Sequence, residues 1–132
     1  MPKFTTDALI HAPWYVHIHL ALSLAAVVIG TLVLVRTKGT SSHKAFGWAW
    51  SAFMVSTALI SFLIQGERRL SLIHLLSVLT LITVPLGIFF IRSKRVLAHQ
   101  LTMCATFAGL VIAGAFTMLP HRILGQLIFG AR

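Results

Sequence analysis

Four long apolar stretches, separated by short polar segments, dominate the sequence. They cover residues 16–35, 45–64, 70–91 and 98–119. Each is close to the roughly 20 mostly apolar residues that an α-helix needs to cross the hydrocarbon core of a bilayer. The connecting segments are short, so consecutive helices should lie side by side and antiparallel. The pattern therefore predicts one all-α domain over residues 1–132, a four-helix transmembrane bundle with up-down-up-down topology.

Prolines and aromatic residues add detail to this pattern. Pro85 lies inside the third stretch and should kink that helix, while Pro120 follows the fourth stretch and should end it. Residues 121–132 are apolar but too few to span, so we expect them along the interface. Four aromatic residues lie near predicted helix ends, where interfacial side chains are enriched: Trp14, Tyr15, Trp48 and Trp50.

The composition supports membrane insertion. Apolar residues make up 58% of the chain and charged residues only 10%, whereas soluble domains carry about 25% charged residues. The net charge of +9 comes from short basic clusters between apolar stretches, which is typical of loops facing anionic headgroups. A lipid bilayer is therefore the predicted partner, and nucleic acid is not. Six cations at residues 36–44 and 92–95 oppose five elsewhere, a small excess that places these loops in the cytoplasm.

Several kinds of chemistry are excluded by what the chain lacks. Asp7 and Glu67 are the only acids, so paired-carboxylate catalysis and a carboxylate-rich divalent metal site are ruled out. No Walker-type or GxGxxG loop is present for a nucleotide. Cys104 is the only cysteine, which excludes an intrachain disulfide and covalent haem attachment through CxxCH. Because it lies in an apolar stretch, Cys104 is expected to be a buried, inert thiol.

Five of the seven histidines lie near the beginning of predicted helices. His17, His19 and His74 begin the first and third, and His43 and His99 begin the second and fourth. Ionisable residues at bilayer depth usually face the bundle interior. If the first and third helices are diagonal neighbours, His19 approaches His74 near one membrane face. His43 then approaches His99 near the other.

The neighbours on each helical face separate His19 from His17. Steps of three and four residues from His19 reach small residues, Ser23, Ala26 and Gly30, whereas the same steps from His17 reach Ala21, Leu24 and Val28. Small residues allow close helix approach and line interfaces between membrane helices. We therefore expect His19 to point inward, with His17 as its substitute.

Facing histidines suggest a cofactor. Two neutral imidazoles from facing helices can hold a haem iron, and helix bundles hold such cofactors in their cores. The predicted cofactor is haem b, bound by His19 with His74 and by His43 with His99. The predicted function is an electron carrier, with a quinone or another redox protein as its partner.

Other interpretations remain open. Interfacial histidines can bind headgroups or cap helices, so the protein could be a structural or accessory subunit, as a homodimer or in a larger membrane complex. Histidine, serine and threonine residues can also form a proton or small-ion pathway, although no acid lies within the apolar stretches. The sequence does not decide whether the protein is an enzyme.

The two halves of the chain show a weak repeat. Residues 35–38 (VRTK) resemble residues 91–94 (IRSK) at an offset of 56, and the same offset brings His43 onto His99. The repeat suggests two related halves, each with a helix, a basic loop, a histidine and a second helix. Such halves would be related by an axis along the membrane normal.

Several motifs resemble a bacterial family of predicted membrane proteins, domain of unknown function 2306. They are the early histidine of the first helix, the segments at 38–40 (KGT) and 43–48 (HKAFGW), and His99 with the run at 113–122 (AGAFTMLPHR). Lys44 stands where the family has arginine. The resemblance covers about residues 14–128 and implies four helices in a bacterial inner membrane, without an assigned activity. The arrangement of histidines, though not the sequence, is similar to transmembrane di-haem b-type cytochromes.

Overall fold

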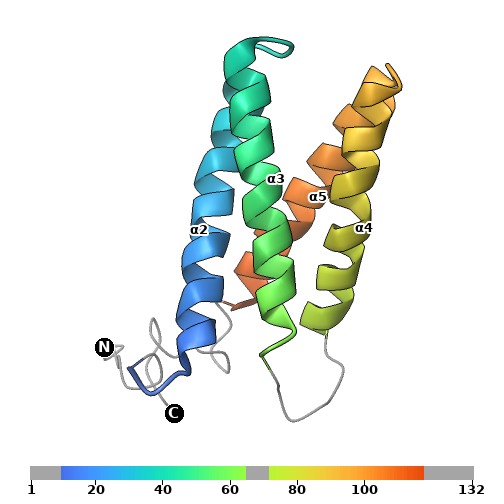
Figure 1. The fold of residues 1–132 in the computed structure, drawn as a ribbon. Helices are drawn as coiled ribbons and strands as arrows, with labels where there is room; N and C mark the ends of the chain where they lie inside the picture. The colour runs from blue at the N-terminus through green and yellow to red at the C-terminus, as the bar shows by residue number, and fades with distance from the viewer. Residues whose placement is uncertain (1–9, 65–71, 118–132) are drawn as a thin grey trace.

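The computed structural model describes residues 10–64 and 72–117. Its helices are α2 (Trp14–Val35), α3 (Ser41–Ser61), α4 (Leu72–Arg92) and α5 (Val96–Thr117). They alternate in direction, and the α2–α3 and α4–α5 turns lie at the same end of the molecule (Figure 1). The predicted all-α four-helix bundle is therefore confirmed. The expectations for residues 1–9, 65–71 and 118–132, including the interfacial tail, fall outside the described residues.

Helix α3 begins four residues earlier than the predicted start at residue 45. Thr40 is its N-cap, and the Thr40 Oγ1 accepts a hydrogen bond from the backbone N–H of His43 at 3.2 Å. The Thr40 carbonyl accepts from the N–H of Lys44 at 3.1 Å. A threonine in this position satisfies an N–H group that the helix leaves unpaired. His43 consequently lies in the first turn of α3.

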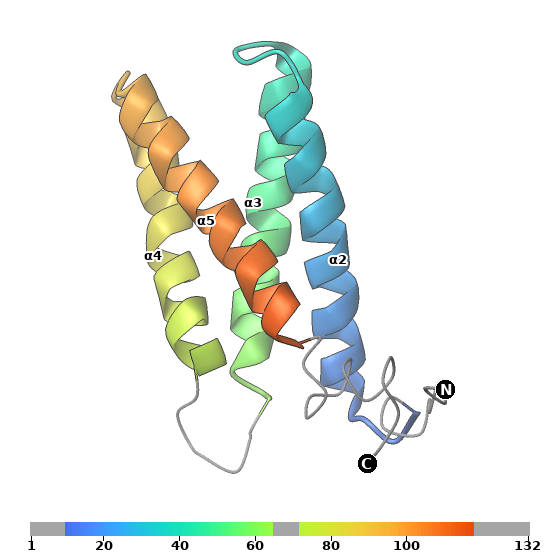
Figure 2. The ribbon, with the colours of Figure 1, turned by 180° about the vertical axis from the view of Figure 1, so that it is seen from behind.

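The four helices are arranged in a ring. Helix α2 packs on α3, α3 on α4 and α4 on α5, and α5 closes the ring against α2. The diagonal pairs are thus α2 with α4 and α3 with α5. Figure 2 shows α5 crossing obliquely, close to α4 near the α4–α5 turn and close to α2 at its other end. The two hairpins therefore diverge toward the end that carries the turns.

Polar side chains connect neighbouring helices inside the bundle. The His19 imidazole bonds the Thr57 carbonyl between α2 and α3, and the Ser61 and Ser77 hydroxyls bond each other between α3 and α4. Between α4 and α5, Thr106 donates to Thr83 Oγ1 at 2.9 Å. Such bonds are typical of membrane helix bundles, where burial of apolar surface does not by itself favour helix association.

By length and composition, three helices could cross a membrane: Trp14–Val35, His74–Arg92 and Val96–Phe116. Many large apolar side chains on them face outward, for example Leu24, Leu79 and Ile112. These features are consistent with a small membrane protein. Helix α3, the fourth predicted span, is less apolar and does not meet the same measure. It is also the helix with the most buried residues recorded, including Ser51, Thr57 and Ser61.

Candidate functional site

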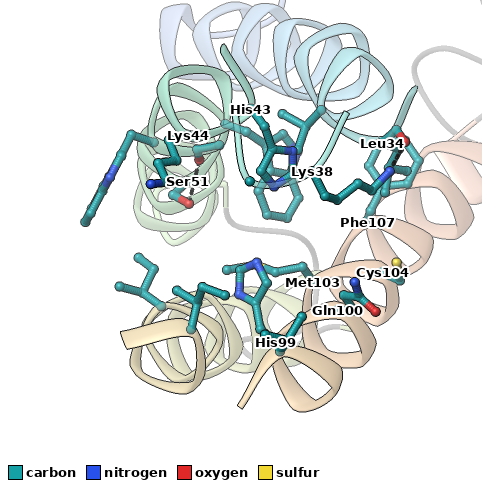
Figure 3. Close-up of a pocket in the computed structure, with 18 of the residues that line it drawn as sticks. Leu34, Lys38, His43, Lys44, Ser51, His99, Gln100, Met103, Cys104 and Phe107 are labelled. Atoms are coloured by element: carbon teal, nitrogen blue, oxygen red, sulfur yellow. Dashed lines mark hydrogen bonds between the residues drawn. The ribbon is translucent and has the colours of Figure 1, made fainter. Parts of the chain in front are cut away.

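A pocket of about 790 Å³ lies between the two hairpins, near the end that carries the turns (Figure 3). Its interior is largely apolar, with Val33, Ile88, Met103 and Phe107 among its walls. Cations from both turns complete its lining: Lys38, Lys44, Arg92 and Lys94. An apolar cavity with a few polar groups is the usual form of a small-molecule site.

His43 and His99 both line this pocket, from the diagonal helices α3 and α5. Figure 3 shows them on opposite walls, with the cavity between their rings. Each lies in the first turn of its helix, next to a turn of the chain. The structure thus brings these two sequence-predicted residues to a single site.

The ring of His99 is held in one orientation. Its Nδ1 lies 2.8 Å from the carbonyl oxygen of Gly87 on α4. A carbonyl oxygen can only accept, so Nδ1 carries the hydrogen and the neutral ring keeps its lone pair on Nε2. Histidines that bind metals commonly donate their second N–H to a carbonyl in this way.

His43 and Trp50 each carry a buried ring nitrogen without a hydrogen-bond partner in the described part of the chain: Nδ1 of His43 and Nε1 of Trp50. Both residues line the pocket, and Trp50 is only 4% exposed. Buried polar atoms nearly always have a partner, so these two nitrogens in the pocket wall are exceptions, and both are covered by protein atoms.

Gly30 on α2 makes room for the Trp50 indole. A Cβ atom at residue 30 would lie 2.7 Å from Trp50 Nε1 and 2.6 Å from the ring of Phe107. Only a residue without a side chain allows both rings to approach α2 this closely. Gly30, Trp50 and Phe107 therefore form the floor of the pocket.

The second predicted pair, His19 and His74, lies on the other diagonal. The Nδ1 of His19 is 3.1 Å from the carbonyl oxygen of Thr57, so the same argument leaves a lone pair on its Nε2. His74 is 6% exposed and packs against Phe62 at 5.8 Å between ring centroids. Neither residue lines the large pocket. His17 is exposed, whereas His19 is half-buried.

Residues 10–64 and 72–117 contain no group of three or more His, Cys, Asp or Glu side chains that could hold a metal ion. The histidines lie instead on two diagonal pairs of helices. A bound group would therefore have to be held by pairs of imidazoles.

Two expectations from the sequence are wrong. Cys104 is exposed and lines the pocket, rather than being buried. Trp50 is buried in the core, although its neighbour Trp48 is 57% exposed as an interfacial residue would be. A separation of two residues on an α-helix is a rotation of about 200° around its axis, so the two indoles point to opposite sides of α3. This helical periodicity in the sequence could have predicted that Trp48 and Trp50 differ in burial.

The chain matches no family model, no curated protein and no solved structure. The resemblance to domain of unknown function 2306 therefore rests on short sequence motifs alone.

Proposed function

We propose that this protein is a small multi-pass membrane protein that carries electrons through a b-type haem held between His43 and His99. The observation that supports it is the position of these two imidazoles on opposite walls of one apolar pocket, from diagonal helices. When bound, the haem supplies reversible one-electron chemistry, and the protein supplies its ligands, orientation and surroundings.

The residues fit such a group. His99 offers Nε2 because Nδ1 is committed to Gly87, and this bond also holds the ring in place. His43 lines the opposite wall of the same pocket. The apolar walls limit access of water, and burial of this kind is one way in which a protein sets a haem potential.

The His19 and His74 pair extends the proposal to a second haem near the opposite end of the bundle. His19 repeats the arrangement of His99, with Nδ1 donating to a carbonyl of a neighbouring helix. Both side chains are at least partly buried. Two haems at different depths would allow electrons to cross the membrane.

The same proposal includes four membrane crossings. Helix α3 is the least apolar, but three of its hydroxyl residues, Ser51, Thr57 and Ser61, are buried inside the bundle. Polar groups in a membrane helix are tolerated when they face the bundle. The turns at residues 36–40 and 93–95 would then lie on the cytoplasmic side, and the bacterial inner membrane is the location that the family resemblance suggests.

The proton-pathway alternative receives less support. Most hydroxyl groups inside the bundle donate to a carbonyl of their own helix, as Ser51, Thr57 and Thr102 do. This is the usual way in which serine and threonine are satisfied within helices.

The test is an absorption spectrum of protein purified from haem-replete cells, with haem quantified by pyridine extraction. We expect a Soret band that shifts on reduction. His99→Ala and His43→Ala should each remove one haem per chain, because each removes an axial ligand. The matched control is His17→Ala, which removes an exposed imidazole and should leave the haem content unchanged. Colourless wild-type protein, or full haem content in His99→Ala, would contradict the proposal.

A further inference from the structure

The end of the bundle that carries the turns is strongly basic. The two acids of the sequence, Asp7 and Glu67, both lie outside the described residues, so no Asp or Glu side chain in the described part balances this charge. The cations divide into two groups. Four line the pocket, namely Lys38, Lys44, Arg92 and Lys94, whereas Arg36 and Arg95 do not. Arg36 instead donates to Ser42 and lies over the ring of Phe46.

Lys94 occupies a backbone conformation that lysine rarely adopts. Its φ is 62°, in the left-handed region, and Arg95 N–H bonds the Phe90 carbonyl at 2.8 Å to close the end of α4. Glycine is favoured at this position of a helix end. In the other turn, the left-handed residue is a glycine, Gly39, with φ of 82°, which lies three residues after the extended C-cap of α2. Lys94 keeps a strained backbone and places a cation on the pocket, and strain of this kind often marks a functional position.

The two ends of the pocket differ in the charge that they can accept. The floor consists of Gly30 and the rings of Trp50 and Phe107, and it carries no charged side chain. The rim offers four cations. A carboxylate buried at the floor would lose its hydration without an opposite charge to replace it, which is strongly unfavourable. A carboxylate at the rim would gain charge-assisted hydrogen bonds.

We propose that the rim formed by Lys38, Lys44, Arg92 and Lys94 binds the two carboxylates of the porphyrin, so that the anionic edge lies at the turns and the apolar edge lies on the Trp50 floor. This inference rests on the proposed function, because it orients the same ligand. The chemistry that it recognises is an amphiphile with an apolar body and an anionic edge. A phospholipid with a net negative headgroup shares that chemistry and is the competing occupant.

The test compares haem with haem dimethyl ester, in which both carboxylates are neutralised. Each is titrated into full-length apoprotein in a neutral detergent, followed by absorbance and by the thermal stability of the protein. We expect haem to bind about tenfold more tightly than the ester, because charge-assisted hydrogen bonds are lost. Lys94→Gly should weaken haem binding by about threefold, the size expected for an exposed cation, and leave the ester unaffected.

Lys94→Gly also has a second, opposite readout. Glycine relieves the left-handed backbone, so the apoprotein should unfold at a higher temperature even though it binds haem less tightly. The matched control is Arg95→Gln, which removes one cation at the next residue but outside the pocket lining. Arg95→Gln should leave the ratio of haem affinity to ester affinity unchanged. It should also leave the unfolding temperature unchanged, because Lys94 keeps its left-handed backbone.

The outcomes separate the inference from the function on which it rests. If wild-type protein binds neither haem nor the ester, the proposed function fails. If it binds both equally, the function stands and the orienting rim is overturned. The rim is also overturned if Lys94→Gly weakens haem and ester alike. Phosphatidylglycerol added to the detergent is the final arm: displacement of haem by this lipid in wild type but not in Lys94→Gly would assign the rim to a headgroup instead.

Discussion

Gly30 lies where three helices meet, and adding one methyl group there should disrupt both the core and the pocket. It is buried on α2, between Trp50 of α3 and Phe107 of α5. A Cβ atom at this position would lie 2.6 Å from two carbons of the Phe107 ring and 2.7 Å from Trp50 Nε1. Real Cβ atoms essentially never approach other atoms this closely. We therefore predict that Gly30→Ala destabilises the bundle.

The size of the effect follows from two opposing terms. Alanine in a helix interior is favoured over glycine by about 1 kcal/mol. Overpacking a core costs about 1–3 kcal/mol. To regain an ordinary contact of 3.4 Å, the Phe107 ring must move by about 0.8 Å, and the Trp50 ring by nearly as much. Trp50 is 4% exposed and has little room to move, so the cost should lie in the upper part of the range. We expect a net loss of about 1–2 kcal/mol.

Unfolding of the purified protein in detergent, followed by circular dichroism, measures this loss. Two other glycines provide matched controls. A Cβ at Gly109 would have no atom within 4 Å, so Gly109→Ala should stabilise the protein by up to about 1 kcal/mol. At Gly87 the new atom would meet the flexible end of Met103 at 2.6 Å, so Gly87→Ala should fall between the two. The reasoning is refuted if Gly30→Ala is as stable as Gly109→Ala.

Two further predictions concern the turn before α3 and the pocket wall. Thr40→Ala should lower the free energy of unfolding by about 1 kcal/mol, because the His43 N–H loses its hydrogen-bond acceptor. Thr40→Ser keeps a hydroxyl group and should retain the stability of the wild type. Equal losses in both variants would exclude the cap as the cause. Cys104 lines the pocket and is exposed, so it should react with a small maleimide in apoprotein, and the reaction should slow when haem is bound. An unchanged rate, followed by mass spectrometry, would place the ligand elsewhere.

The arrangement of the helices followed from the sequence because it depends on local patterns. Apolar runs of about the length of a membrane span, separated by short polar segments, allow few alternatives to antiparallel neighbours. The early start of α3 was missed because the apolar run begins at residue 45, whereas the capping threonine lies at residue 40. An N-cap lies outside the apolar pattern by its nature, since it is a polar residue before the first turn.

The pocket was harder to predict, because its floor depends on contacts between helices. The close approach of Trp50 to Gly30 joins α3 to α2, and no spacing within either helix reveals it. The position of Cys104 also depends on how far the two hairpins diverge. The histidines were easier to select as candidate site residues from the sequence. An ionisable residue in an apolar helix is energetically costly, so its presence there favours a specific role.

Helix α3 connects the membrane assignment to the proposed site. It is the least apolar of the four helices, yet it supplies His43 and Trp50, the two residues whose buried ring nitrogens lack partners in the described part of the chain. Three of its buried residues are serine or threonine. A helix that lines a ligand pocket must carry polar groups, and it can do so in a bilayer only when neighbouring helices separate them from the lipid. Ser51 lines the proposed pocket, whereas Thr57 and Ser61 bond to α2 and α4, so the low apolarity of α3 is compatible with the fourth crossing that we propose.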